Sequence, residues 1–288
     1  MSVDLAVATP AFVDLTFVGL EAVPRPGQER YARDLLRSPG GGAITAIGAA
    51  RLGLDVALAS PLGADPEGRE MLRTLLDEGV ACAGGETERS AVSVVMPAEG
   101  DRAFATYDPH TPVSGEILAA LAPRAVVVGL GDLGLAPDGA WTYVTTGDAG
   151  AAAYAGRLPA TLKDARAIIV NEPEALLLTG APDVEAAAHA LAEHAAMAVV
   201  TLGPGGAVAA GDGELWRADA PDIDVVDPTG AGDLFTAAYV WADLDGAQPA
   251  DRIGWATLYA AMSVGVPTGL AGAARLDELL SAAAKEKA

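Results

Sequence analysis

Short runs of consecutive apolar residues, rich in valine and isoleucine, recur along the chain and predict β-strands. Most positions of these runs are apolar, instead of every second one, so both faces of the sheet that they form must be covered. They span residues 3–8, 56–60, 125–128, 141–145, 167–170 and 198–202. The pattern therefore indicates a central sheet that is buried on both sides.

Helical patterns rich in alanine and leucine lie between several of these runs. One spans 43–52, one begins at Asp65-Pro66 and ends at Gly79, and a third spans 184–196. Aspartate is a favoured N-cap, and proline is favoured in the first helical turn. Strands that alternate with helices predict an α/β fold, with a mostly parallel central sheet between two helical layers. No linker-like stretch divides the chain, so we expect one domain over residues 1–288.

Two further regions read as extended chain outside this alternation. Residues 13–36 contain two extended segments, and residues 90–96 and 102–107 resemble a hairpin around Glu99-Gly100-Asp101. We expect the four strands to form a small β-sheet lid, with lid segments at about 13–37 and 89–108. Lids of this kind close over active sites and exclude water. The alternative is an ordinary edge extension of the main sheet.

One uncharged stretch, residues 253–274, is long enough for a membrane span. Gly265, Pro267, Gly269 and Gly272 interrupt its second half. A buried helix followed by a loop therefore explains the stretch better.

The amino-acid composition limits the classes of molecule that the protein is expected to bind. The formal net charge of −21 repels phosphate backbones and anionic lipid, so we expect neither nucleic acid nor a membrane surface as a partner. Cys82 is the single cysteine, which excludes an intrachain disulfide, and the chain begins without a signal-peptide pattern. We therefore expect a cytoplasmic protein.

The sharpest chemical feature is residues 227–233, D-P-T-G-A-G-D, which run directly into a helical pattern. The glycines let the backbone approach a ligand closely, and the amides of Gly230 to Asp233 would point out of the helix start. Such amides bind anions. A carboxylate beside a bound phosphate is useful when it accepts the proton of an attacking hydroxyl. The alternative is that Asp233 only caps the helix.

Four other motifs follow one another along the chain: Asp14, a triple glycine at 40–42, N-E-P-E at 171–174 and T-L-G-P-G-G at 201–206. Together with residues 227–233 they resemble the ribokinase-like (PfkB-type) sugar kinase family over nearly the whole chain. The resemblance implies a ribokinase-like fold and phosphoryl transfer from ATP, with Mg²⁺, to a hydroxyl of a sugar or polyol.

The resemblance also implies roles for individual residues. Asp233 would be the catalytic base, and Gly230, Ala231 and Gly232 would form the anion hole. Asp14, with Gly40, Gly41 and Gly42, would bind the acceptor. The nucleotide would lie against Asn171, Thr201, Gly203, Gly206, Thr229, Gly230 and Thr257. Glu174 would hold Mg²⁺ through water, and Asp227 resembles a residue near a potassium site.

Two positions and one four-residue stretch depart from the family pattern. Ile44 stands where the family usually carries a sugar-binding asparagine, and Thr257 replaces a nucleotide-contacting asparagine. Residues 145–148, T-T-G-D, replace an aspartate-asparagine element. The ATP and base machinery therefore follows the family more closely than the acceptor pocket does.

Other interpretations stay open. The acceptor could be a nucleoside whose base stacks on lid aromatics. It could also be a sugar acid or a sugar phosphate that Arg89 and Arg102 bind. A different class is a non-catalytic sensor of sugars or nucleotides. Residues 129–134, G-L-G-D-L-G, match a dinucleotide-binding pattern, but Pro137 follows where that motif needs a helix. Exposed lid strands often pair between subunits, so we also expect a homodimer.

Overall fold

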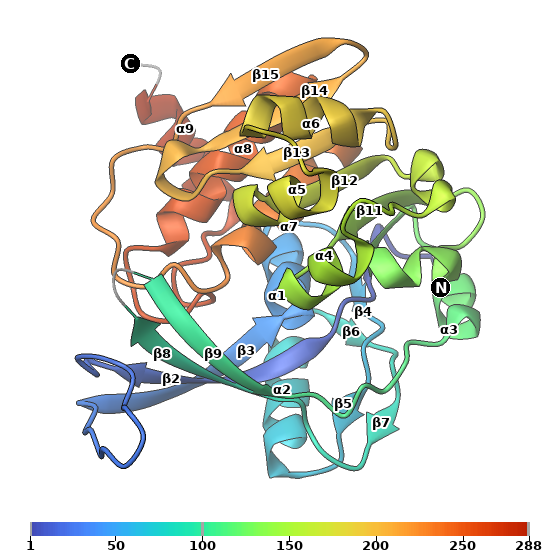
Figure 1. Ribbon diagram of the computed structural model, residues 1–288. Coiled ribbons are helices and arrows are strands. Elements are labelled where there is room, and N and C mark those ends of the chain that lie inside the picture. The colour runs from blue at the N-terminus through green and yellow to red at the C-terminus, as the bar shows by residue number, and fades with distance from the viewer. Residues whose placement is uncertain (1, 99–100, 287–288) are drawn as a thin grey trace.

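The computed structural model describes residues 2–98 and 101–286, and the predicted turn at Glu99-Gly100 lies outside them. A large sheet runs through the molecule with helices on both faces, and a smaller sheet projects from one side (Figure 1). The predicted α/β fold with a mostly parallel central sheet and a separate small sheet is therefore confirmed.

Within the described residues the large sheet has nine strands. Their spatial order is β15 (Glu214–Ala218), β14 (Ala207–Gly211), β13 (Ala198–Thr201), β12 (Ala167–Asn171), β11 (Trp141–Thr145), β10 (Ala125–Gly129), β1 (Leu5–Val7), β4 (Val56–Leu58) and β6 (Ala81–Cys82). Neighbouring strands are parallel, except that β14 pairs antiparallel with β13 and with β15. The parallel strands therefore all end at one edge of the sheet.

Alternate residues of each strand pack into two separate cores. Leu5 and Val7 of β1 belong to one core, and Ala6 between them belongs to the other. The first core is completed by α1 (Gly42–Arg51), α2 (Pro66–Asp77), α7 (Ala231–Leu244), α8 (Pro249–Ser263) and α9 (Leu276–Glu286). The second is completed by α3 (Gly115–Leu121), α4 (Asp148–Tyr154), α5 (Glu172–Thr179) and α6 (Val184–Ala192). Burial on both faces explains why the strand sequences are continuously apolar.

The small sheet contains the four strands that the sequence predicted. Its order is β3 (Asp34–Gly41), β2 (Ala11–Val18), β8 (Val92–Ala98) and β9 (Asp101–Tyr107). Strands β2 and β8 are parallel, and the two outer pairs are antiparallel. Because none of the four pairs with the large sheet, the edge-extension alternative is wrong. A short parallel pair, β5 (Leu62–Gly63) with β7 (Glu86–Thr87), lies apart from both sheets.

The antiparallel strands β14 and β15 have no counterpart among the predicted strands. Their turn carries a recognisable signal, because Asp212-Gly213 is a favoured two-residue hairpin turn. Both residues have positive φ angles, 50° and 80°, as that turn requires. The signal is masked because β14 is rich in alanine, which has little intrinsic preference for strands. The position of β14 beside β13 follows from the burial of its side chains.

Two other predicted helical segments can be compared directly with the structure. The helical pattern at 184–196 gives a shorter helix, because α6 ends at Ala192. The uncharged stretch at 253–274 gives the predicted arrangement, with α8 ending at Ser263 and turns following it. Among the described residues, no helix has both the length and the apolar character needed to span a bilayer.

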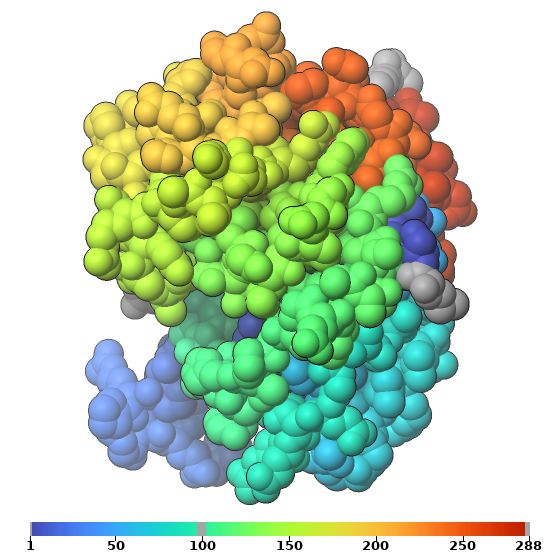
Figure 2. Space-filling model, turned by 90° about the vertical axis from the view of Figure 1, so that its right-hand side faces the viewer, coloured from blue at the N-terminus to red at the C-terminus, as the bar shows by residue number. Residues whose placement is uncertain are grey.

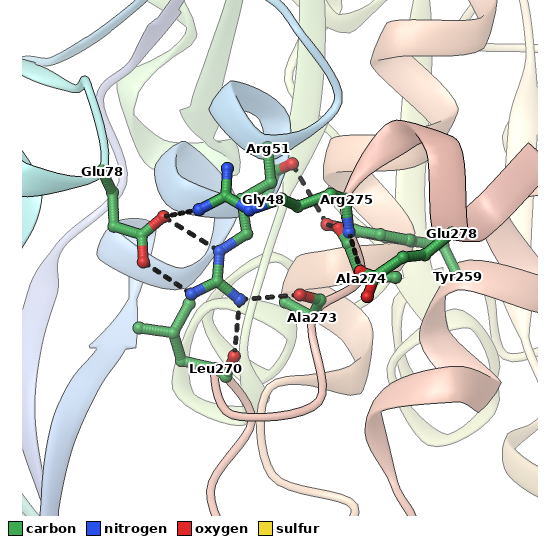
Figure 3. A network of polar contacts seen from close by, with 9 residues as sticks. All are labelled: Gly48, Arg51, Glu78, Tyr259, Leu270, Ala273, Ala274, Arg275 and Glu278. Carbon is green, nitrogen blue, oxygen red and sulfur yellow. Dashed lines mark hydrogen bonds and ion pairs between the residues drawn. The ribbon is translucent and has the colours of Figure 1, made fainter.

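Helix α1 is held tightly against α7 and α8. A β-carbon on Gly48 would lie 2.6 Å from Leu234 Cδ2 of α7, so a larger residue would force the Leu234 side chain to move. The Tyr259 hydroxyl of α8 lies 3.2 Å from the Gly48 carbonyl and 2.9 Å from that of Ala274 (Figure 3). The second half of α1 is therefore held against the amino-terminal end of α7.

Arg51, at the carboxyl end of α1, holds the helix to two further segments. Its guanidinium donates to both carboxylate oxygens of Glu78, at 3.0 and 2.6 Å, and to the carbonyls of Leu270 and Ala273, at 3.0 and 2.6 Å (Figure 3). Bidentate arginine–carboxylate pairs are geometrically specific. One side chain thus joins α1, the end of α2 and the segment before α9.

A buried carboxylate secures the carboxyl end of α7. Asp243 is 1% exposed and accepts hydrogen bonds from Tyr143 at 2.7 Å and from Arg166 at 2.9 and 2.8 Å. Arg252 of α8 lies 3.0 Å from the same carboxylate, and Arg166 stacks over the ring of Trp141 at 4.4 Å. Although burial alone would raise the pKa of Asp243, these partners hold it below its usual value.

We predict that Asp243→Ala lowers the free energy of unfolding by about 3–5 kcal/mol, because two guanidinium groups lose their buried counter-charge. The measurement is urea unfolding followed by circular dichroism. Glu185→Ala is the matched control, since its pair with Arg217 is half exposed on both sides. That change should lower the free energy of unfolding by less than about 1 kcal/mol. Equal losses in both variants would contradict the role given to Asp243.

Candidate active site

A cavity of about 590 Å³ lies between the small sheet and the carboxyl ends of the parallel strands. The small sheet contributes Phe12, Asp14, Ser93, Arg102 and Phe104 to its lining. In Figure 2 the blue part of the small sheet projects from the main body, with a recess between them. Ligands of open α/β sheets bind at this edge, so the cavity is the candidate active site.

The described lining brings together many residues that the sequence singled out. They are Asp14, Gly41, Gly42, Asn171, Glu174, Thr201, Thr229, Gly230, Gly232 and Asp233. Six others lie outside the described lining: Gly40, Gly203, Gly206, Asp227, Ala231 and Thr257.

The start of α7 forms one wall of the cavity. Gly230 has a φ of +78°, and a β-carbon there would lie 2.7 Å from Ile44 Cδ1 and 3.0 Å from Gly269 Cα, so the position requires glycine. Among the described residues, the amides of Gly230, Gly232 and Asp233 have no acceptor. The Ala231 amide is partly used, because it donates to the Pro228 carbonyl at 3.3 Å. The expected set of four outward amides is therefore smaller by one.

Thr229 and Asp227 shape the loop before α7. The Thr229 hydroxyl is buried without a hydrogen-bond partner in the described part of the chain, and the residue lines the cavity. Asp227 accepts backbone hydrogen bonds from Thr229 and Thr268, both at 2.9 Å. A buried hydroxyl without a partner is unfavourable, so it fits a site that a polar ligand completes.

Asp233 stands at the third position of α7 with its carboxylate at the cavity. Thr45 of α1 donates its hydroxyl to Asp233 Oδ1 at 3.3 Å. Burial raises the pKa of Asp233 to about 7, while the Thr45 hydrogen bond and the charge of Arg102 act in the opposite direction. A carboxylate that titrates near neutral pH suits proton transfer.

Asp14 faces the same cavity from β2 and is 5% exposed. Burial raises its pKa to about 7, and the negative charges of Asp233 and Asp227 add to the rise. A β-carbon on Gly40 would lie 2.2 Å from Asp14 Oδ1, so this glycine of β3 leaves room for the carboxylate. Gly40 thus acts on the cavity through Asp14, while Gly41 and Gly42 line it directly.

Asn171 and Glu174 begin α5 with a reciprocal capping box. The Glu174 amide donates to the Asn171 side-chain oxygen at 2.8 Å, and Glu174 Oε2 accepts from the Asn171 amide at 3.0 Å. Burial raises the pKa of Glu174 to about 7. Both residues line the cavity, so the capping role and a ligand-binding role are compatible. The box uses only Oε2 of Glu174.

The nucleotide positions expected from the sequence are spread over several elements. Thr201 ends β13 and lines the cavity, while Gly203 and Gly206 lie in the turn that follows, η3 (Gly203–Gly205) and its cap. Thr257 lies inside α8 and is 5% exposed, and its hydroxyl has no partner among the described residues.

Several lining residues were not singled out from the sequence, notably Thr45 and Ser93. Thr45 stands inside a helical pattern, and Ser93 stands inside a strand pattern, where neither has a local motif. Ser93 is nevertheless the partner of Asp14 in the register of β2 and β8. Strand pairing was the one signal that would have found it.

We predict that Asp14→Asn stabilises the protein, and more so at higher pH. The folded state holds the Asp14 proton up to about pH 7, whereas an unfolded aspartate releases it near pH 4, so stability falls between these values as the pH rises. Asparagine removes that dependence. Thermal unfolding at about pH 5.5 and pH 8 should show a larger gain at pH 8. An equal gain at both pH values would contradict the raised pKa.

Comparison with solved structures shows the same fold along the whole chain. A putative ribokinase from Agrobacterium tumefaciens is 23% identical, with a TM-score of 0.82, covering 98% of this chain and 97% of that one. Arabidopsis thaliana ribokinase complexed with ribose and ATP is 23% identical, with a TM-score of 0.78 and 98% of each chain covered. Adenosine kinase from Sinorhizobium meliloti is 21% identical, with a TM-score of 0.81, covering 99% of this chain and 100% of that one.

A search of the curated proteins gives no match. The model of the pfkB family of carbohydrate kinases matches residues 11–272, which include the small sheet, most of the cavity lining and the start of α7. The chain therefore belongs to the pfkB carbohydrate kinase family and is a phosphotransferase.

Proposed function

We propose that the protein transfers the γ-phosphoryl group of ATP to a hydroxyl of a sugar or polyol, with Asp233 as the general base. The observation that carries this proposal is the position of the Asp233 carboxylate, beside helix-start amides that have no acceptor among the described residues. Those amides suit the transferred phosphoryl group, and the carboxylate suits the proton of the attacking hydroxyl.

The nucleotide is proposed to lie between the Thr201–Gly206 turn and the loop that leads into α7. Val225 and Val226 in that loop are 55% and 57% exposed, although they are apolar. The Val226 amide donates to the Val264 carbonyl at 2.8 Å, which ties the loop to the end of α8. Exposed apolar side chains beside an anion site suit a flat base, whose phosphates then reach Gly230, Gly232 and Thr229.

Mg²⁺ is proposed to be held near Glu174, mainly through water and phosphate oxygens. When bound, the ion neutralises charge that develops on the phosphate oxygens. Its site fits the residues present, because a carboxylate lines the cavity of a protein that has few positive charges there. A potassium ion near Asp227 stays a prediction.

The acceptor is proposed to bind against a polar row on the small sheet. Asp14 is the register partner of Ser38 on β3 and of Ser93 on β8, and Ser93 is the partner of Thr106 on β9. Residues directly opposite each other share one face of a sheet. The row therefore offers a carboxylate and neighbouring hydroxyls on the cavity side, which suits a molecule with several hydroxyl groups.

A nucleoside acceptor is the second candidate. Phe12 and Phe104 both line the cavity, and Phe104 is 52% exposed. Exposed aromatic rings of this kind can stack on a flat base. The chain is also similar to an adenosine kinase.

The proposal also covers the movement of the small sheet, the oligomeric state and the cellular compartment. We propose that the small sheet acts as a lid, and that a homodimer forms through its exposed outer strands. The protein is proposed to work in the cytoplasm, where Cys82, whose thiol pKa burial raises to about 11, stays a thiol.

The test is ATP consumption by the purified protein with a panel of sugars, polyols, sugar acids and nucleosides. We predict that Asp233→Asn lowers kcat by roughly 10²–10⁴-fold, because base and positioning are both lost, while ATP affinity is retained. Activity confined to nucleosides would favour the second candidate. Tight binding of a sugar or nucleotide without any ATP consumption would favour a non-catalytic sensor.

We predict that Ser93→Ala raises KM for the best acceptor by roughly twofold to tenfold, the value of one hydrogen bond, with kcat and KM for ATP unchanged. Deoxy analogues of that acceptor provide the internal comparison. The analogue that lacks the hydroxyl bound by Ser93 should bind equally well to the native protein and to Ser93→Ala. Ser281→Ala on α9 is the control outside the cavity. An unchanged acceptor KM in Ser93→Ala would contradict the polar-row model.

A further inference from the structure

Thr45 connects α1 to the candidate base. Its side chain is buried, with the residue 2% exposed, and its hydroxyl donates to Asp233 Oδ1 at 3.3 Å. The preceding residue, Ile44, packs against Gly230 at the start of α7. Adjacent residues of α1 therefore contact both parts of the α7 start, one by packing and the other by a hydrogen bond.

The position of this hydroxyl is set by the fold. Gly48 brings α1 close to Leu234, and the Tyr259 hydroxyl holds the Gly48 carbonyl. Threonine is also restricted about its first side-chain torsion in a helix. The donor is thus preorganised, because its helix is held against α7 and α8 and its side chain has only two preferred rotamers.

We propose that Thr45 is a positioning residue for phosphoryl transfer, whose hydroxyl holds Oδ1 of Asp233 and so leaves Oδ2 directed to the acceptor hydroxyl. A carboxylate that rotated freely would meet the acceptor in the correct geometry only part of the time, and orientation contributes substantially to rate. The kinetic part of this inference rests on the proposed function, whereas the contact itself does not.

Charged groups around Asp233 determine how strongly the Thr45 hydroxyl affects the ionisation of Asp233. Asp14 faces the same cavity from β2 and Arg102 faces it from β9, while Asp227 lies in the loop before α7. Burial favours the neutral form of Asp233, and Thr45 and Arg102 favour the charged form. Removal of the Thr45 donor leaves Arg102 as the favourable partner, so the carboxylate becomes harder to ionise.

The test compares Thr45→Val, which removes the donor at similar size, with Thr45→Ser, which keeps it. Carboxyl ¹³C NMR of the full-length, ligand-free protein follows the aspartate titrations, with Asp233→Asn and Asp14→Asn assigning the two signals. We expect Thr45→Val to move the Asp233 midpoint upward by about 0.5 to 1 pH unit, the value of one hydrogen bond. Thr45→Ser and the control Thr142→Val in β11 should leave the midpoint in place.

With an active acceptor, the rising limb of the kcat–pH profile should move in the same direction in Thr45→Val, with KM for ATP unchanged. Thr45→Ala removes the hydroxyl a second way and should behave similarly. An unmoved titration and an unmoved pH profile in both deletions would overturn the inference. Normal turnover in Asp233→Asn would instead overturn the proposed base, and the NMR titration separates these two failures.

Discussion

The site depends on one unfavourable placement: a carboxylate held in a largely buried position at the start of a helix. Burial raises the pKa of Asp233 to about 7, and the amides of Gly232 and Asp233 have no acceptor among the described residues. Helix-start amides favour anions. An anionic ligand at those amides would therefore complete the site, and the same carboxylate would be available to take a proton from an alcohol.

This placement requires support from several directions. The carboxyl end of α7 is anchored by Asp243 and its arginine partners, far from the cavity along the helix. Its amino end is fixed by α1, through Gly48 and Thr45. Opposite it, Asp14 lies in a recess that Gly40 leaves open. Stability and activity compete here, because two carboxylates are held near each other where both are difficult to ionise.

The proposed acceptor surface lies on the small sheet. By the motif resemblance Ile44 stands where the family usually carries an asparagine, and because it packs against Gly230 this position offers no polar contact of its own. On the small sheet, Asp14 and Ser93 place polar groups in register, and Thr45 places a hydroxyl beside Asp233. A family resemblance therefore identifies the reaction class more readily than the acceptor.

The sequence by itself determined the features whose cause is local. Continuous apolar runs require a doubly covered sheet, and D-P-T-G-A-G-D requires a glycine turn into a helix, so the parallel strands and the α7 start were predictable. Asp212-Gly213 carried a hairpin signal as well, although alanine in β14 masked its strand. Only the tertiary structure decided that Ser93 lies beside Asp14, that Gly40 accommodates that carboxylate, and that Thr45 reaches Asp233 across 188 positions. These contacts depend on strand register and helix packing, which no short stretch of sequence encodes.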